Sequence, residues 1–542
     1  FSAMVGMGSE SRSVDDFVQR HLSARNLLPD FINLDRFGYP DRLNCVSLLL
    51  DDAITEGHGD RPCLRSSAIS WTYAQTQEQV NRVANYLVNE CGLRPGERVL
   101  VGGPNTPLVA ACWLAIVKAG GVAVSTMALL RAGELVTIAD KAQARISLCD
   151  GSVADAYITA QAQVPSWQIL TVLGSADLDI ALQAQSSNFN AVSTAADDVC
   201  LIAFTSGTTG NPKGCVHFHR DVMTICHTVC QELLQANSND VFVGSPPLAF
   251  TFGLGGLLLF PLFARASTVM LEKPSPPNLA EAIDGFGATV CFTAPTAYRA
   301  MLLSQSENDF GSLRKAVSAG EALPRATYDL WLAATGLKLI DGIGSTELLH
   351  IFISASGEAI RPGATGRPLS GWEARVTDDE GNTLPDGEVG NLMVRGPIGC
   401  RYLDDPRQAN YVVDGWNRTG DKFIRDTDGY FWFQSRADDM IISSGYNIAA
   451  PEVEDAILRH EAVAEVAVVG VPDDERGNVV KAFVVAASGV SGSAELIETL
   501  QNHVKREIAP YKYPRAIEFV NELPKTKTGK IQRFKLLNRQ QK

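Results

Sequence analysis

Positive charge is in deficit across this chain. The 542 residues include 47 Lys and Arg against 61 Asp and Glu, which gives a formal net charge of −14. A protein that binds nucleic acid normally presents a basic face, so the balance disfavours nucleic acid as a partner. An anionic substrate would have to be held by local cations and backbone amides, against the mean field of the protein.

Paired cysteine motifs are missing. The sequence has 11 cysteines but no Cys-x-x-Cys pair. Cys226, His227 and Cys230 come closest to a metal-binding cluster, and no second pair of ligands accompanies them. A structural zinc site normally takes four such ligands, so zinc is not expected. The pattern is typical of reduced core thiols in a cytosolic protein.

Long hydrophobic runs are missing as well. The most apolar stretch, residues 248–264, is shorter than a bilayer span and is interrupted by Gly and Pro, so it is predicted to be buried core. Residues 1–9 lack a basic region followed by an apolar core, and no signal peptide is expected. We therefore expect a cytoplasmic protein without a membrane partner. The sequence also contains no internal repeat.

Helical and strand patterns alternate over most of the chain. Residues 98–101, 122–124 and 199–204 are short apolar runs of strand type. Apolar residues recur at helical spacing after Trp71 and again over residues 107–119. Strand, helix and strand in this order indicate a parallel sheet with crossover helices.

The length and a change of pattern predict two domains. Hydrophobic residues make up 45% and charged residues 20%, as in a globular protein, but 542 residues exceed one compact core. After about residue 375, short strands alternate with turns. We predict an α/β fold with an N-terminal domain, residues 1–435, of parallel-rich sheets and helices that includes a β-rich subdomain. A small α+β C-terminal domain, residues 436–542, would follow.

A glycine-rich loop follows the apolar run that ends at Phe204. Its sequence is Thr205-Ser-Gly-Thr-Thr-Gly-Asn-Pro-Lys-Gly214, and its three glycines allow backbone N–H groups to approach an anion. It lacks the Walker spacing, so an ordinary P-loop NTPase is disfavoured. The candidate phosphate-binding residues are Thr205, Ser206, Gly207, Thr208, Thr209, Gly210 and Lys213.

This loop resembles the signature of the adenylate-forming superfamily, which includes acyl- and aryl-CoA synthetases, peptide-synthetase adenylation domains and beetle luciferases. The resemblance extends from Trp71 to Lys530, with the motifs in family order. It implies an AMP-forming acid–thiol ligase that uses ATP, Mg²⁺ and CoA. It also implies a small C-terminal domain that moves relative to the large one.

Further motifs are similar to the nucleotide-binding segments of the family. Asp341-Gly-Ile-Gly-Ser-Thr-Glu347 resembles the second nucleotide motif, Ser318-Ala-Gly-Glu-Ala322 the adenine segment and Trp416-Asn-Arg-Thr-Gly-Asp421 the ribose motif. Glu347 is a hard oxygen ligand suited to Mg²⁺. The resemblance implies that ATP is bound by Ala319, Gly320, Glu321, Asp341 at the adenine edge, Gly342, Thr346, Asp421 and Arg436.

The C-terminal motif Leu523-Pro-Lys-Thr-Lys-Thr-Gly-Lys530 places Lys530 where the family has its catalytic lysine. Such a lysine would bridge the substrate carboxylate and the α-phosphate as charge builds in the transition state. Thr346, which can donate to the α-phosphate, and Glu347 would act with it. These three residues are the predicted catalytic group.

The same resemblance places a hinge and a CoA channel in the C-terminal part. Asp438 occupies the hinge position of the family. Ser444 and Gly445 match the segment that faces the pantetheine arm of CoA, for which glycine leaves room. Lys512 and Arg515 fall where related aryl-CoA ligases hold the CoA phosphates.

Pro246-Pro-Leu-Ala-Phe-Thr-Phe-Gly-Leu-Gly255 resembles the acid-binding motif, and Phe250 takes the position of its aromatic gate. Two phenyl rings among aliphatic and neutral polar groups suit a small aromatic carboxylate better than acetate. The predicted lining of the pocket is His227, Thr228, Phe250, Thr251, Phe252, Gly344, Leu349 and His350.

The overall pattern most resembles 2-aminobenzoate-CoA ligases, with benzoate-CoA ligases next. We expect His350, Thr251 or His227 to contact an ortho amino group. Leaving a buried polar group unpaired is costly, so such a contact would discriminate against benzoate. Benzoate or another substituted benzoate is the alternative substrate.

Other functions share these motifs. One is a standalone adenylation enzyme that loads a carrier protein, although no pantetheine-type motif follows Lys530. A nucleotide sensor without activity is disfavoured, because Glu347, Asp421, Arg436 and Lys530 are all present. A luciferase-type oxygenase shares every motif, and nothing in the sequence favours it. A monomer or a homodimer is expected.

Overall fold

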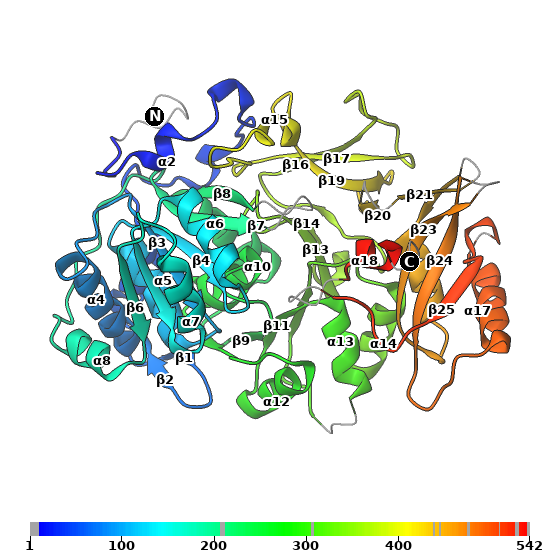
Figure 1. The fold of residues 1–542 in the computed structure, drawn as a ribbon, viewed down its shortest axis with the longest axis horizontal. Coiled ribbons are helices and arrows are strands. Elements are labelled where there is room, and N and C mark those ends of the chain that lie inside the picture. Colours follow the sequence, from blue (N-terminus) through cyan, green and yellow to red (C-terminus); the bar gives the residue numbers. More distant parts are fainter. Residues whose placement is uncertain are drawn as a thin grey trace.

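The computed structural model of the protein describes residues 10–205, 212–304, 308–436, 440–443, 446–473, 477–508, 510–525 and 531–538. Two large sheets with their helices form the N-terminal part, and three smaller sheets follow towards the C-terminus (Figure 1). The predicted α/β class with parallel-rich sheets is confirmed.

The first sheet has six strands in the order β6-β5-β3-β4-β7-β8. All neighbours are parallel except the hairpin of β7 and β8, whose connection is the predicted phosphate loop. The strands are β3 (Arg98–Gly103), β4 (Val122–Met127), β5 (Ile146–Asp150), β6 (Ile169–Leu173), β7 (Val199–Thr205) and β8 (Lys213–Phe218).

The second sheet has nine strands in the order β15-β14-β13-β12-β11-β9-β10-β1-β2. Its six central strands are parallel, and β2, β14 and β15 add antiparallel edges. The strands are β1 (Pro62–Arg65), β2 (Ser70–Thr72), β9 (Val241–Gly244), β10 (Ser267–Val269), β11 (Val290–Thr293), β12 (Lys315–Ser318), β13 (Leu339–Gly344), β14 (Ile351–Ser354) and β15 (Arg367–Pro368).

Helices separate and cover the two sheets. α5 packs on β3 and β4, and its neighbour α4 packs on β1 and β2, so this pair lies between the sheets. α6 and α7 cover the other face of the first sheet, and α12 to α14 cover the other face of the second. These helices are α4 (Tyr73–Asn89), α5 (Pro107–Lys118), α6 (Ala132–Ala142), α7 (Ala154–Gln161), α8 (Ala176–Gln183), α12 (Pro276–Phe286), α13 (Pro295–Leu303) and α14 (Arg325–Thr335).

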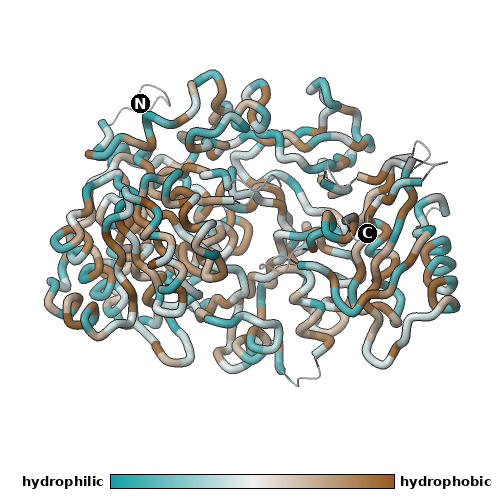
Figure 2. Tube along the Cα trace, in the orientation of Figure 1, coloured by the Kyte–Doolittle hydropathy of each residue, from teal (hydrophilic) through white to brown (hydrophobic). Residues whose placement is uncertain are grey.

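The sequence of α5 explains its central place. Thr106 caps the helix by accepting from the Val109 N–H, and Pro107 occupies the first turn, where its missing N–H costs nothing. Nearly every later residue of α5 is buried, because a helix that is hydrophobic on all sides must be covered on all sides. Hydrophobic residues are correspondingly frequent in this layered region (Figure 2).

The apolar stretch at residues 248–264 is buried core, as predicted. It forms α10 (Thr251–Leu254), the π-helical segment η6 (Gly255–Leu259) and α11 (Phe260–Phe263). A second π-helical segment, η5 (Cys226–Leu233), continues α9 (His219–Ile225). In the described part of the chain, no helix combines the length and the hydropathy that crossing a membrane requires.

A five-stranded antiparallel sheet follows, as predicted for residues beyond about 375. The helix α15 (Gln408–Tyr411) accompanies it. Its strands are β16 (Glu373–Thr377), β17 (Val389–Arg395), β18 (Val412–Val413), β19 (Trp416–Arg425) and β20 (Phe431–Arg436).

The C-terminal part has its own hydrophobic core beneath a three-stranded sheet. A hairpin of two strands packs beside this sheet. A boundary at residues 435 and 436 remains a prediction, and Asp438 lies outside the described residues. The elements are β21 (Met440–Ser443), β22 (Tyr446–Ala449), α16 (Ala450–Leu458), β23 (Val463–Asp473), β24 (Gly477–Ala486), α17 (Ala494–Glu507), β25 (Ala516–Phe519) and α18 (Arg533–Asn538).

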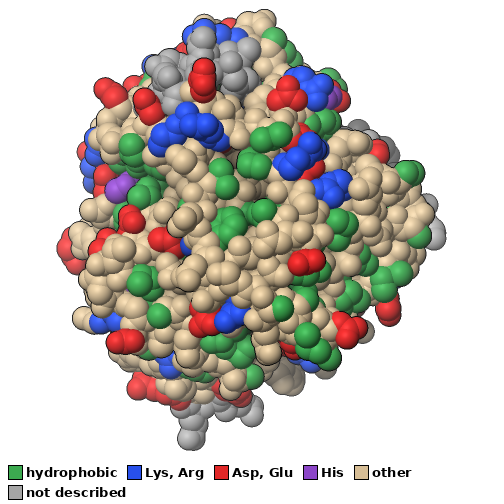
Figure 3. All heavy atoms as spheres, turned by 90° about the vertical axis from the view of Figure 1, so that its left-hand side faces the viewer, with side chains coloured by type: hydrophobic (Ala, Val, Ile, Leu, Met, Phe, Trp, Pro, Cys, Tyr) green, Lys and Arg blue, Asp and Glu red, His purple; other side chains and the backbone are tan. Residues whose placement is uncertain are grey.

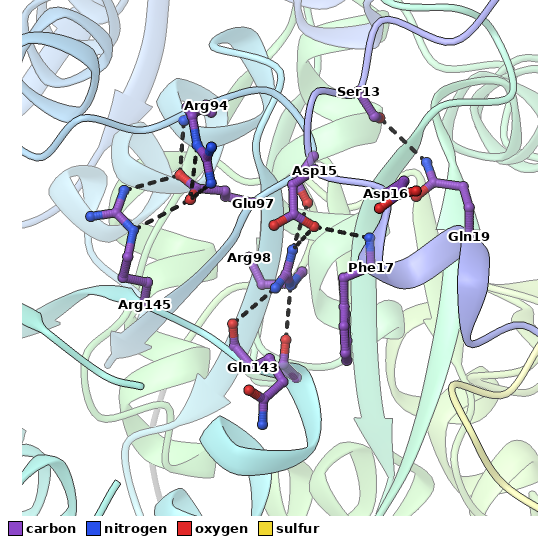
Figure 4. A network of polar contacts seen from close by, with 12 residues as sticks. Ser13, Asp15, Asp16, Phe17, Gln19, Arg94, Glu97, Arg98, Gln143 and Arg145 are labelled. Atoms are coloured by element: carbon purple, nitrogen blue, oxygen red, sulfur yellow. Dashed lines mark hydrogen bonds and ion pairs between the residues drawn. The ribbon is translucent and has the colours of Figure 1, made fainter. Parts of the chain in front are cut away.

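A buried arginine fastens the N-terminal segment to the first sheet. Arg98, which begins β3, is 5% exposed and contacts the Asp15 carboxylate at 2.5 Å. Its guanidinium also donates to the backbone carbonyls of Gly96, Ala142 and Gln143 (Figure 4). The charge of Arg98 is thus compensated although water is excluded.

The face drawn in Figure 3 carries acidic and basic side chains in alternation among apolar ones. They do not gather by sign on the described part of this face.

Candidate active site

Several predicted motifs lie along one edge of the nine-stranded sheet. The neighbouring strands β9, β11, β12 and β13 are parallel and end at Gly244, Thr293, Ser318 and Gly344. The carboxyl ends of parallel strands meet at the same edge, which is where ligands bind in open α/β sheets. The acid motif follows β9, the adenine segment follows β12, and the second nucleotide motif begins in β13.

The predicted phosphate-loop lysine meets the predicted metal ligand. Lys213 opens β8 opposite Thr205, and its Nζ donates to Glu347 Oε1 at 3.2 Å and to the Tyr402 hydroxyl at 2.8 Å. The Tyr402 hydroxyl donates to the same Glu347 oxygen at 2.5 Å. Two motifs far apart in sequence therefore converge, with Tyr402 as a member that the sequence did not reveal. Ser206, Gly207, Thr208, Thr209 and Gly210 lie outside the described residues.

Burial keeps the Tyr402 hydroxyl protonated. Glu347 is 7% exposed. Burial raises the pKa of Tyr402 far above its usual value, and the negative charge of Glu347 raises it further. The phenol therefore remains protonated and serves as a hydrogen-bond donor.

A second buried chain of contacts fixes the nucleotide motif to β8. His217 Nε2 lies 2.8 Å from the carbonyl oxygen of Thr346. Its Nδ1 lies 3.8 Å from Asp221, whose carboxylate accepts from Arg401 at 2.7 Å. Burial alone would raise the pKa of Asp221, but Arg401 and His217 outweigh it and hold that pKa well below its usual value. Asp221 is therefore ionised, and Thr346 has a firm backbone anchor.

The two predicted ribose contacts pair with one another. Asp421 in β19 lies opposite Arg436 in β20, and Arg436 Nη1 lies 3.1 Å from Asp421 Oδ1. Burial raises the pKa of Asp421; Arg436 opposes this shift, and Glu347 adds to it. Glu347 therefore lies near enough to Asp421 to interact with it electrostatically, which links Asp421 and Arg436 to the cluster of Lys213, Tyr402 and Glu347.

The predicted adenine residues lie in β13 and in the loop that follows the adjacent strand β12. Ser318, before Ala319 and Gly320, pairs with Asp341, before Gly342. Ala319 is buried, and Gly320 has a φ of +90°, a left-handed conformation that glycine adopts without strain. Glu321 follows in the same loop and is partly exposed.

Asp341 has the most displaced carboxyl group of the predicted site. Burial raises the pKa of Asp341 to about 7, although the Gly342 N–H and the Thr365 side chain oppose the shift. A small cavity lies beside it and is lined also by Arg361 and Thr365. This carboxyl group can change its charge near neutral pH.

A strained turn joins Glu347 to His350. Leu349 is fully buried and has a φ of +69°, and the His350 N–H donates to the Leu348 carbonyl at 2.9 Å across it. A branched residue held in this region costs about 1–3 kcal/mol, and such strain gathers at functional sites. A Cβ on Gly344 would lie 2.6 Å from the His350 carbonyl oxygen, so only glycine fits there.

His350 lies in a cluster of phenyl rings. Its ring centroid is 4.7 Å from that of Phe260, 5.6 Å from Phe252 and 6.4 Å from Phe292. A Cβ on Gly255 would lie 2.5 Å from His350 Cδ2, so glycine there admits the imidazole. His350 thus takes its place among these rings by close packing on a helix backbone.

Burial keeps the imidazole of His350 neutral. Burial at 2% exposure lowers the pKa of His350 to about 3, although the nearby backbone of Phe252 opposes the shift. Within the described chain neither ring nitrogen has a hydrogen-bond partner of good geometry. An unpaired buried polar group is costly, so this imidazole is suited to pair with a ligand.

Asn105 holds the acid motif in place, and sequence reasoning missed it. Asn105 is 5% exposed, and its Nδ2 donates to the Pro246 carbonyl at 3.0 Å while its Oδ1 accepts from the Leu248 N–H at 2.8 Å. Phe250 and Thr251 then start α10. No local sequence signal identifies Asn105, because its partners lie more than a hundred residues away.

The structure places His227 and Thr228 on η5. The His227 ring lies 5.4 Å from Phe37 and 5.0 Å from Phe263, and its Nδ1 lies 2.8 Å from Gln231 Oε1. The Thr228 hydroxyl donates to a backbone carbonyl of its own helix at 3.0 Å. Both side chains are thus engaged with other protein groups.

The predicted CoA contacts also have protein partners. Lys512 Nζ donates to the Glu452 carboxylate at 2.6 Å, and Arg515 donates to the Tyr513 hydroxyl at 3.1 Å. Lys530, Asp438, Ser444 and Gly445 lie outside the described residues.

A cluster of metal-type side chains lies elsewhere in the core. Cys45, Cys200 and His219 are buried and present ligand atoms within 4.8 Å of one another. The Cys45 backbone N–H donates to His219 Nδ1 at 3.2 Å, so the nitrogen that faces the thiols is already occupied. This cluster therefore packs as part of the core, as expected for most cysteines of the chain.

Comparisons with known proteins agree with this geometry. A model of the family described as AMP-binding enzyme matches residues 51–401, and a model of the AMP-binding enzyme C-terminal domain matches residues 452–530. Benzoate–CoA ligase of Thauera aromatica is 36% identical over 509 residues, which cover 92% of this chain and 96% of that protein.

Solved structures give the same result. The crystal structure of the anthranilate CoA ligase AuaEII in complex with anthranoyl-AMP matches with a TM-score of 0.89 and 35% identity, over 93% of this chain and 98% of that one. A benzoate CoA ligase from Burkholderia xenovorans LB400 matches with a TM-score of 0.83 and 33% identity, over 91% and 100%. The predicted superfamily and the enzyme class of AMP-forming acid–thiol ligases are confirmed. The chain belongs to the AMP-binding enzyme family.

Proposed function

We propose that the protein is an ATP-dependent aryl-CoA ligase whose substrate is a small aromatic carboxylate, with 2-aminobenzoate as the preferred acid. One observation carries the proposal: the neutral imidazole of His350, whose nitrogens have no hydrogen-bond partner of good geometry among the described residues, lies among phenyl rings on the same turn as Glu347, which contacts Lys213. An aromatic acid that fits the ring cluster would lie beside a group suited to phosphate chemistry.

The nucleotide would occupy the edge of the nine-stranded sheet. The Thr205–Lys213 loop would hold the phosphates, Asp341 the adenine edge, and Asp421 with Arg436 the ribose. Glu347 fits a hard cation, because it offers buried carboxylate oxygens and its neighbour Lys213 is a flexible side chain that can turn to phosphate. A bound Mg²⁺ would neutralise charge on the phosphates.

The first half-reaction would form an acyl-adenylate. A carboxylate oxygen of the acid attacks the α-phosphorus of ATP, and the bond from that phosphorus to pyrophosphate breaks. Charge accumulates on the phosphoryl oxygens, where Lys213, Thr346 and Lys530 would donate. The protein therefore supplies position and electrostatic stabilisation.

The second half-reaction would use CoA. The thiol sulfur attacks the acyl carbon, the bond to AMP breaks, and the thiol proton leaves to solvent as thioester and AMP form. Lys530 would be needed only in the first step. A rotation of the C-terminal part about Asp438 would withdraw Lys530 and present the segment with Ser444 and Gly445.

Two relatives support an aromatic substrate, since their names give benzoate and anthranilate as the acids they act on. We propose that His350 accepts a hydrogen bond from the ortho amino group of 2-aminobenzoate, because burial keeps the imidazole neutral. Benzoate would leave that nitrogen unpaired, so 2-aminobenzoate should have the higher kcat/KM.

Release of pyrophosphate, measured over a panel of small aromatic acids with and without free CoA, tests this function. We expect release with 2-aminobenzoate and conversion to its thioester when CoA is added. Equal kcat/KM for 2-aminobenzoate and benzoate would refute the role of the amino group. Pyrophosphate release without any thioester from free CoA would favour the alternative, an enzyme that loads a carrier protein.

A further inference from the structure

Tyr402 lies between the two charged groups at the centre of the site. It is fully buried, and a bridge to Cys215 in β8 holds its backbone. Its hydroxyl is 2.8 Å from Lys213 Nζ and 2.5 Å from Glu347 Oε1, and its ring centroid is 4.8 Å from Lys213 Nζ. A single phenol thus contacts both the cation and the anion.

The direction of both hydrogen bonds is fixed by chemistry. An ammonium group has donors only, and an ionised carboxylate has acceptors only. The Tyr402 hydroxyl must therefore accept from Lys213 and donate to Glu347.

Both contacts fall on one oxygen of Glu347. Lys213 and Tyr402 bind Oε1, and in the described ranges no residue donates to Oε2. A carboxylate held by one oxygen keeps the lone pairs of the other for a cation. In metal sites, groups that hydrogen-bond to a ligating side chain set the orientation and the basicity of that ligand. Tyr402 contacts Glu347 in the same way.

We infer that Tyr402 is a positioning residue for the metal-bound nucleotide: its hydroxyl holds Glu347 by Oε1 and leaves Oε2 directed to the divalent cation of ATP. This inference rests on the proposed function, in which Glu347 holds Mg²⁺. When Lys213 turns from Glu347 to the phosphates, the Tyr402 hydroxyl stays as the protein donor to Oε1. The carboxylate of Glu347 then keeps its orientation although its salt bridge with Lys213 is lost.

Tyr411 provides a matched control. Its ring contacts Tyr402 edge to face at 5.8 Å and lies 5.9 Å from Lys213 Nζ. Its hydroxyl, however, lies 3.4 Å from Ser345 Oγ and not at Glu347. Removing this hydroxyl changes a buried phenol in the same cluster without touching the carboxylate.

The test compares Tyr402→Phe and Tyr411→Phe with the parent protein. Mn²⁺ binding to the enzyme–ATP complex is measured by electron paramagnetic resonance. We expect Tyr402→Phe to weaken Mn²⁺ binding about tenfold, as for other partners of metal ligands, and Tyr411→Phe to leave it within about twofold. In pyrophosphate release, Tyr402→Phe should raise the half-saturating Mg²⁺ concentration by a similar factor and leave the KM of the acid unchanged.

A double substitution guards against a general loss of fold. In a Glu347→Gln background, Tyr402→Phe should cause no further loss of Mn²⁺ binding, and an independent tenfold loss would overturn the inference. So would parent-like Mn²⁺ binding in Tyr402→Phe, or an equal rise in the KM of the acid. Failure of the parent to release pyrophosphate with any acid would instead reject the proposed function, while Mn²⁺ binding still decides the role of Tyr402.

Discussion

Glu347 and His350 lie on one turn, three positions apart, and face two different environments. The carboxylate of Glu347 contacts Lys213 and Tyr402, whereas the imidazole of His350 packs against Phe260. The left-handed residue Leu349 between them makes the change of direction possible. The conformation of Leu349 therefore sets the position of Glu347 relative to that of His350.

The first prediction concerns Gly255. In Gly255→Ala the new methyl group would lie 2.5 Å from His350 Cδ2, so the imidazole must move. A shift of about 1 Å at a reacting centre can cost on the order of a hundredfold. We expect kcat/KM for the aromatic acid to fall at least tenfold, by order of magnitude, and the KM for ATP to stay unchanged, as measured by pyrophosphate release.

Gly285→Ala is the control, because a Cβ at that position of α12 would meet no described atom within 4 Å beyond its own helix. Parent-like kinetics on the acid in Gly255→Ala would show that His350 does not line the pocket.

The second prediction separates the two half-reactions. Lys530→Ala should lower acyl-adenylate formation by roughly two to three orders of magnitude, the usual effect of removing one donor to a developing charge. Thioester formation from supplied acyl-adenylate and CoA should persist. Lys525→Ala is the matched control, since Lys525 forms a salt bridge with Glu465 at 2.5 Å. Comparable loss of both half-reactions in Lys530→Ala would contradict domain alternation.

The third prediction is a pH dependence of ATP binding. Burial raises the pKa of Asp341 to about 7, so this carboxyl group is protonated below neutral pH. Only the ionised form accepts from the amino group of adenine through both oxygens. ATP affinity should therefore rise as pH increases from 6 to 8, measured by calorimetry.

Asp341→Asn should remove this dependence. The effect of pH on the free energy of unfolding has the opposite sign. Between the ordinary pKa of Asp and about 7, the native Asp341 carboxyl keeps a proton that the unfolded chain releases. Its contribution to the free energy of unfolding therefore falls as pH rises through this range. A pH profile of ATP affinity that is the same in parent and variant would exclude Asp341 from the adenine edge.

The fourth prediction concerns stability. Asp15→Ala leaves Arg98 buried without its counter-ion and should lower the free energy of unfolding by about 3 kcal/mol. Asp16→Ala removes an exposed pair with Arg20 and should cost no more than about 0.5 kcal/mol. Urea unfolding of both variants measures the difference. Equal midpoints would mean that the N-terminal segment is not fastened by Arg98.

Local patterns predicted the elements that depend on neighbouring residues. The apolar run at residues 98–101 became β3, and the helical spacing at residues 107–119 became α5, because burial and capping act within a few residues. Motifs likewise placed Lys213 and Glu347 in one group, and the structure brings them to 3.2 Å.

Partners from distant segments could not be predicted. Tyr402 lies 55 residues from Glu347 and carries no signal of its own, since its role arises only when β8 and the turn after β13 meet. The aromatic group around His227 was equally hidden, because Phe37 comes from a segment without regular pattern. Such contacts depend on the tertiary packing of whole layers, which single-sequence periodicity does not encode.

The widened helical turns of η5 and η6 have an evolutionary consequence. A π-type turn accommodates one residue more than an α-type turn, and one residue advances a helix by about 100°. A single-residue deletion within η6 would therefore rotate the backbone around Gly255 and bring a different set of side chains to the ring cluster. Acid preference in descendants of this protein would then change through chain length at one helix, with every nucleotide motif left intact.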